Sequence, residues 1–188
     1  MLTAMGDVMR EAYRRGWITT RDGNISVRMG KYLYVTPTMV RKYTIQPENI
    51  VKMVFDSDLS EQQGASIELD MHWQVQLQPG VKAVVHLHPT HTIAAMHAGF
   101  SLQKLADQFV ELGRYTKVGP EVPMFPPGST GLADTTAINI TDADIVGQAR
   151  HGVTAKAKNP WDAFEHIERL EHICQIVLAS GVRPDERT

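Results

Sequence analysis

This 188-residue chain has little of several features that would mark a special class of protein. It has one cysteine, Cys174, so it cannot form an internal disulfide and is not a fold built on disulfides. No apolar run is long enough to cross a bilayer, and the N-terminal residues carry charges where a secretory leader would be apolar. These absences predict a cytoplasmic protein.

The chain also lacks an excess of charge of either sign. Its 19 basic and 21 acidic side chains leave a formal net charge of -2, so neither nucleic acid nor a membrane is an expected partner. The hydrophobic share of 43% and the charged share of 21% are ordinary for a globular protein. With no repeat, low-complexity segment or linker, residues 1–188 are expected to form one domain.

Apolar spacing predicts an alternation of helices and strands. Helices are expected at residues 2–13, 67–78 (with Ser66 as N-cap), 91–99, 102–113 and 132–140, and from Pro160 onward. Strands are expected at residues 24–29, 32–37, 49–56, 81–88 and 144–157. The hairpin-like connections argue against a purely parallel sheet. The predicted fold is therefore a three-layer α/β/α sandwich on a mainly antiparallel central sheet.

The most informative residues are His86 and His88, which end an apolar, β-branched segment. A strand turns residues i and i+2 to the same face, so both rings can reach one point, and Pro89 ends the strand there. Imidazole is the commonest protein ligand for zinc. The pair therefore indicates a metal site, although histidines on strands are often only half-exposed surface residues.

Two further residues could complete such a site. His151 precedes Gly152 in a predicted strand, and glycine there leaves room for the close approach of a ligand or side chain. Three imidazoles would leave the fourth position of a catalytic zinc open. Glu68, near the start of the helix before the histidine strand, could act as general base or acid. The alternatives are a hydrogen-bonded strand histidine and a capping-box or surface glutamate paired with His72.

The segments DGNISVR, YVTPT, SIELDMH, PGVKAVVHLHP and RHG, followed by a long final helix, resemble the class II aldolase/adducin family in order and spacing. The resemblance implies zinc, or another divalent metal, at His86, His88 and His151. It also implies that Glu68 is the catalytic acid/base. In the family, the residues matching Gly23, Asn24, Thr38 and Ser66 fall in the pocket for the donor's phosphate.

This chain departs from the family pattern at two positions of that pocket. Met39 stands where the family usually has glycine, and Ile67 stands where it has a second serine. The loss of these two donors predicts a preference for a non-phosphorylated donor or unusual tolerance of one. Arg41 and Lys42, the neighbouring basic pair, could attract an anionic substrate, but two adjacent basic residues in a loop are usually solvated.

The resemblance implies a zinc-dependent aldolase that cleaves or forms a carbon–carbon bond in a small ketose or ketose phosphate through a metal-stabilised enediolate. The alternatives are a metal-dependent decarboxylase, dehydratase or epimerase of the same family, or a non-catalytic, adducin-like interaction module. The resemblance also implies a symmetric homo-oligomer, most simply a tetramer.

Overall fold

The computed structural model describes residues 1–55, 59 and 63–184 of the chain. Its centre is a six-stranded sheet with the order β3-β2-β1-β4-β6-β5, in which every pairing is antiparallel. The strands are β1 (Asn24–Met29), β2 (Tyr32–Val35), β3 (Val51–Val54), β4 (Ala83–Leu87), β5 (Ile145–Gln148) and β6 (Gly152–Ala157). Asp56, the last residue of the predicted third strand, lies outside the described residues.

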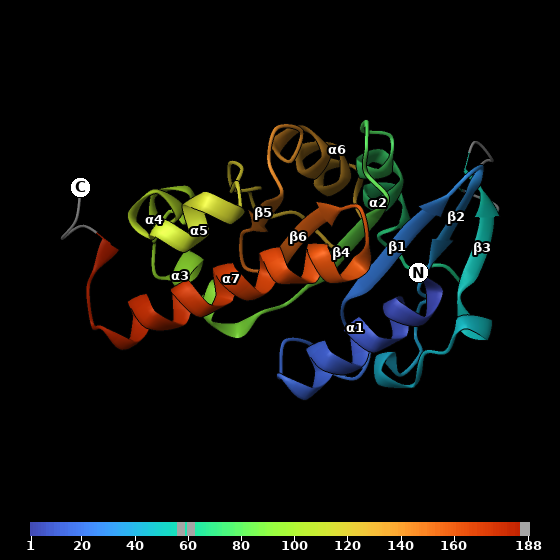
Figure 1. Ribbon diagram of the computed structural model, residues 1–188, viewed down its shortest axis with the longest axis horizontal. Helices are drawn as coiled ribbons and strands as arrows, with labels where there is room; N and C mark the ends of the chain where they lie inside the picture. The colour runs from blue at the N-terminus through green and yellow to red at the C-terminus, as the bar shows by residue number, and fades with distance from the viewer. Residues whose placement is uncertain (56–58, 60–62, 185–188) are drawn as a thin grey trace.

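Helices cover both faces of this sheet (Figure 1). On one side, α2 and α6 pack against each other and against the sheet, while α1, α7 and the short helices α3–α5 lie on the other side. They are α1 (Leu2–Arg14), α2 (Leu69–Gln76), α3 (Thr90–His97), α4 (Leu102–Gln108), α5 (Val110–Tyr115), α6 (Thr130–Asn139) and α7 (Pro160–Ala179). The three-layer α/β/α arrangement on an antiparallel sheet is confirmed.

Alternation along β4 divides the core between the two layers. Ala83, Val85 and Leu87 belong to the larger apolar cluster beneath α1 and α7, whereas Val84 belongs to the cluster beneath α2 and α6. His86 follows the period of Val84, so its ring lies on the α2 side of the sheet. The strand pattern thus places this histidine between the sheet and helix α2.

Local signals fixed several element ends. Gly30 adopts a φ of 59° in the turn between β1 and β2, a left-handed conformation that favours glycine. Asn159 accepts a hydrogen bond from the backbone N–H of Asp162 at 3.0 Å, and Pro160 is the first residue of α7, as predicted. Ser129 caps α6 in the same way. Within the described part of the chain, no helix has both the length and the apolar character of a membrane span.

Three element predictions were wrong. The helix expected at 102–113 is two helices, because Phe109 takes an extended conformation (φ -114°, ψ 114°) between α4 and α5. The strand expected at 144–157 is a hairpin of β5 and β6. The helix expected from residue 67 begins at Leu69, with Glu68 at the N-cap position. Ser66 is therefore not the cap: it lies three residues before Leu69, and its Oγ accepts a hydrogen bond from the Glu68 N–H at 3.3 Å.

Candidate metal and acid–base site

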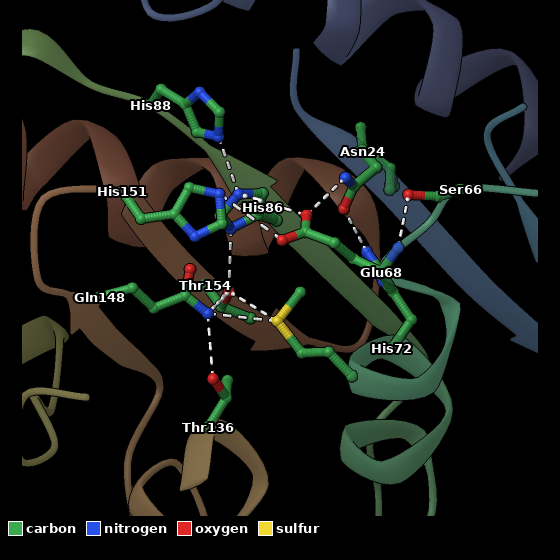
Figure 2. Close-up of polar contacts among 12 residues, drawn as sticks. Asn24, Ser66, Glu68, His72, His86, His88, Thr136, Gln148, His151 and Thr154 are labelled. Carbon is green, nitrogen blue, oxygen red and sulfur yellow. Dashed lines mark hydrogen bonds and ion pairs between the residues drawn. The ribbon is translucent and has the colours of Figure 1, made fainter. Parts of the chain in front are cut away.

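Three imidazoles meet at one end of the β4–β6 strand pair (Figure 2). His86 lies in β4, His88 follows the end of that strand, and His151 precedes the first residue of β6. The three ring centroids are 4.7 to 5.0 Å apart, and the Nε2 atoms of His86 and His88 are 2.9 Å apart. One ligand atom from each residue lies within 4.8 Å of the others, so this group could hold a metal ion.

Gly152 makes this close arrangement possible. A Cβ atom at this position would lie 2.4 Å from the Leu87 carbonyl oxygen and 2.7 Å from Cδ2 of His88, which is closer than atoms can pack. The close approach expected at this glycine is therefore present. However, His151 belongs to the turn that joins β5 to β6, not to the interior of a strand, and its neighbour Arg150 has a φ of 58°.

Glu68 reaches this group from the start of α2. Its Oε2 lies 3.5 Å from Nε2 of His86, and its Oε1 lies 3.5 Å from Nε2 of His151. The residue is 3% exposed, so it is not a surface partner, and its N-cap position excludes it as the N3 member of a capping box. A buried carboxylate beside three imidazoles is placed where it could exchange protons with a bound molecule.

The sheet register places His86 in a cross-strand row of three side chains. Asn24 of β1, His86 of β4 and Thr154 of β6 are direct cross-strand partners, so their side chains share one face. The hydroxyl of Thr154 donates to the Met71 sulfur at 3.5 Å, which leaves Oγ1 to accept from Nδ1 of His86 at 3.1 Å. His86 therefore presents the lone pair of Nε2 to the centre of the group.

The protonation states and unpaired atoms of this group suit a metal. Burial, reinforced by the neighbouring imidazoles, holds the pKa of His86 well below its ordinary value. Burial, again with His151, lowers the pKa of His88 to about 4. Both rings are thus neutral, the form that binds metals. Two buried atoms here, Glu68 Oε1 and His151 Nδ1, lack a hydrogen-bond partner among the described residues. A divalent cation fits this donor set.

A cavity of about 360 Å³ opens beside the group. The four residues predicted for substrate binding all line it, together with Glu68, His88 and His151: Gly23, Asn24, Thr38 and Ser66. Met39 and Ile67 lie on its rim, with 67% and 65% of their surfaces exposed. Met39 has a φ of 56°, so the turn keeps a glycine-like backbone while it carries an apolar side chain.

Lys42 also lines this cavity, although it was not among the predicted site residues. It was expected to be solvated, but it is 2% exposed because the short 3-10 helix η1 (Lys42–Thr44) packs against α1. Its Nζ donates to the Pro37 carbonyl at 2.6 Å. Burial lowers its pKa to about 8, although Asp22 and Glu68 oppose the shift, so the ammonium form persists at pH 7. No local signal marks this burial, which depends on packing between distant segments.

His72 is the second functional candidate that sequence reasoning missed. It was read as a possible surface partner of Glu68, but it is fully buried between α2 and the sheet. Its ring nitrogens hydrogen-bond to Ser26 and Asn24. The spacing of Glu68, His72 and Gln76 at i, i+4 and i+8 contained the signal, because these positions share one helix face. Polar residues along the helix face that packs on a sheet indicate a buried network of hydrogen bonds.

Nearly the whole chain is similar to known proteins. Residues 3–178 match the family described as "Class II Aldolase and Adducin N-terminal domain". An L-fuculose phosphate aldolase of Methanococcus maripaludis is 29% identical over 176 residues, covering 93% of this chain and 94% of that protein. A 3-oxo-tetronate 4-phosphate decarboxylase of Pectobacterium atrosepticum is 27% identical over 176 residues, covering 91% and 80%. Relatives named for two different reactions thus match nearly the whole chain.

The likeness extends to the solved fold. The crystal structure of L-fuculose-1-phosphate aldolase from Thermus thermophilus has a TM-score of 0.81 against this chain, at 22% identity. The match covers 95% of this chain and 93% of that one. The two chains therefore share a fold.

Proposed function

Because this chain belongs to the class II aldolase and adducin family, we propose that it is a metal-dependent carbon–carbon lyase of the aldolase type. The observation that carries this proposal is the convergence of His86, His88 and His151 with the buried carboxylate of Glu68 at a substrate-sized cavity. A non-catalytic interaction module would not need three imidazoles and a buried carboxylate gathered beside such a cavity.

In this proposal the three imidazoles hold zinc, or another divalent metal in its place. Three protein ligands leave a coordination position free for substrate. The metal would supply Lewis-acid stabilisation of the negative charge that develops on the substrate's oxygens. The protein's contribution is to keep His86 and His88 neutral, to orient His86 through Thr154, and to bury the His86 ring away from water.

Glu68 is the proposed acid/base. In the cleavage direction Glu68, as the carboxylate, would take the proton of the hydroxyl on the departing carbon. The bond between the carbons α and β to the carbonyl would then break, its electron pair would stay on the α carbon of the donor fragment, and the aldehyde would leave. A proton must then reach the carbon that retained the pair. Glu68 Oε1 is placed to deliver it, because this oxygen is buried, lacks a hydrogen-bond partner among the described side chains and faces His151.

The charges around the cavity favour a substrate with an anionic group. Arg21 and Lys42 are balanced by Asp22 and Glu68, so a bound divalent cation leaves the cavity with a net positive charge. The preference for a non-phosphorylated sugar was expected from the loss of two hydrogen-bond donors at Met39 and Ile67. Lys42 provides a charged donor that this expectation did not include. We therefore propose a sugar phosphate or sugar acid as substrate, with Thr38, Ser66 and Lys42 near its anionic group.

A decarboxylase is the second candidate, favoured by the relative of Pectobacterium atrosepticum that bears that name. It would use the same metal and proton donor but release carbon dioxide. One experiment separates the two. The metal-loaded protein is incubated with a panel of ketose phosphates, free ketoses and 3-oxo sugar acids, and aldehyde and carbon dioxide are measured with and without chelator. Aldehyde release that chelation abolishes supports the aldolase. Carbon dioxide release alone would replace it with the decarboxylase.

We further propose that the protein acts in the cytoplasm as a closed homo-oligomer, most simply a tetramer. The buried, unpaired Cys174 is compatible with a reducing compartment. Light scattering at micromolar concentration tests the assembly, and a fully active monomer would contradict it.

A further inference from the structure

A chain of hydrogen bonds joins helix α2 to strand β1 and ends at Glu68, and Figure 2 shows its links among His72, Asn24 and Glu68. Asn24 Nδ2 donates to Glu68 Oε2 at 2.8 Å, and Asn24 Oδ1 contacts Nε2 of His72. Nδ1 of His72 lies 2.9 Å from the Ser26 hydroxyl. The Ser26 oxygen in turn accepts from Gln76 Nε2 at 3.1 Å. All five side chains are buried.

Hydrogen-bond chemistry sets the direction of every link. An ionised Glu68 can only accept, so the Asn24 amide must turn its NH₂ group toward the carboxylate and its oxygen toward His72. Nε2 of His72 must then carry the hydrogen. Burial lowers the pKa of His72 to about 3, so the ring is neutral and Nδ1 accepts from Ser26. The Ser26 hydroxyl is free to donate there because Gln76 supplies the hydrogen that its oxygen accepts.

We propose that His72 is a positioning residue, which fixes the Asn24 amide so that it holds Oε2 of Glu68 and leaves Oε1 free to exchange protons. An asparagine amide can flip, and the flipped form would set its oxygen against the carboxylate. His72 prevents the flip because its Nε2–H needs the amide oxygen as acceptor. This inference rests on the proposed function, since it assigns His72 to the proposed acid/base.

The proposal also changes the role expected for Asn24. The residue was expected in the substrate pocket, and it does line the cavity, but both ends of its amide are bound within the protein. The main role of Asn24 in this proposal is therefore to position the Glu68 carboxylate. The anionic group of a substrate would depend more on Thr38, Ser66 and Lys42.

The first test reads the network without turnover. In protein labelled with ¹⁵N, long-range spectra of the histidine rings report which nitrogen of His72 is protonated. We expect the neutral Nε2–H tautomer in wild type between pH 6 and 8, and Asn24 side-chain amide protons that exchange slowly with water. An Nδ1–H tautomer would overturn the proposal. A protein that cleaves none of the substrates would count against the proposed function and would leave this result intact.

The second test compares substitutions that keep different parts of the ring. The amide nitrogen of His72→Gln reaches the place of Nε2 and can still donate to Asn24, whereas His72→Asn reaches only the place of Nδ1 and His72→Phe keeps neither contact. We expect kcat to fall roughly tenfold to a hundredfold in His72→Asn and His72→Phe, with KM and metal content unchanged, and to stay within about threefold of wild type in His72→Gln.

A purely structural role would give a different pattern. All three variants leave some buried polar group unpaired, so each should lower the melting temperature, and stability alone does not discriminate between them. Equal kcat values in His72→Gln and His72→Asn, or a kcat that follows the fraction of folded protein, would overturn the proposal. Variants that fail to fold leave the tautomer measurement on wild type as the deciding result.

Discussion

Replacement of Lys42 by methionine tests the proposed anionic substrate, because it removes the buried charge and keeps most of the side-chain volume. A hydrogen bond to a charged group contributes about 1.5 to 3 kcal/mol, which corresponds to roughly a tenfold to 150-fold change in affinity. We therefore expect KM for a ketose phosphate or sugar acid to rise within that range in Lys42→Met. KM for the matched neutral sugar should change little.

The same substitution should not destabilise the protein. Burial lowers the pKa of Lys42 from 10.5 to about 8, so its charged form costs about 3 kcal/mol in the folded state. Methionine removes this cost, while the Pro37 carbonyl loses its donor, which offsets about 1 to 3 kcal/mol of the gain. The free energy of unfolding at pH 7 should therefore stay level or rise by up to about 2 kcal/mol.

The pH dependence follows from the direction of this shift. Below about pH 8 the folded and unfolded chains both hold the Lys42 proton, so the cost of burying the charge is fully present. Between about pH 8 and 10.5 the folded protein has lost this proton and the unfolded chain still holds it. Wild type should therefore gain stability relative to Lys42→Met in this window. Its affinity for an anionic substrate should fall as pH rises through about 8.

Chemical denaturation at pH 7 and pH 10, with steady-state kinetics on matched substrate pairs, measures these effects. The control is Arg41→Met, which removes the same charge from the adjacent, exposed position. If Lys42→Met bound the anionic substrate as well as wild type, Lys42 would have no role in recognition. A loss of more than about 1 kcal/mol of stability at pH 7 would show that the buried ammonium is net stabilising, and the argument from its lowered pKa would be wrong.

Three further substitutions test the metal and acid–base assignments. His88→Ala should reduce bound metal, measured by elemental analysis, to a small fraction of one equivalent per chain, while the exposed-residue control His97→Ala keeps it in full. Glu68→Gln should keep metal and fold but lower kcat by about a hundredfold to ten-thousandfold, and near-normal turnover would remove its catalytic role. Gly152→Ala should weaken metal binding in a competition titration, because its methyl group would meet the Leu87 carbonyl at 2.4 Å and displace the His88 ring. An unchanged metal affinity would show that the hairpin can shift without disturbing the three histidines.

The features that could be predicted from the sequence were those set by neighbouring residues. The cap and proline that begin α7 act within one helical turn, and the alternation of His86 and His88 follows from the period of a strand. The His151–Gly152 pair made a third ligand plausible, but no local rule brings His151 to the end of β4, so the full set of three imidazoles was implied by the family resemblance. The structure brings them together as the resemblance implied.

The errors came from interactions between distant segments. Phe109 interrupts a continuous helical pattern without glycine or proline, and its ring packs against the main core. Lys42 reads as a solvated loop residue until η1 packs against α1. The alternative interpretation of His72 and Glu68 as a surface pair fails because the sheet covers that face of α2. In each case tertiary packing overrode a reasonable local preference.

The row of Asn24, His86 and Thr154 across three neighbouring strands has a consequence for protein engineering. A cross-strand row is held by the backbone ladder, whereas Met39 and Ile67 lie outside helices and strands on the rim of the cavity. Libraries restricted to those two rim positions should therefore change which sugars are accepted without moving the chemical groups. Variants from such libraries should differ mainly in substrate specificity, and most of them should still bind metal.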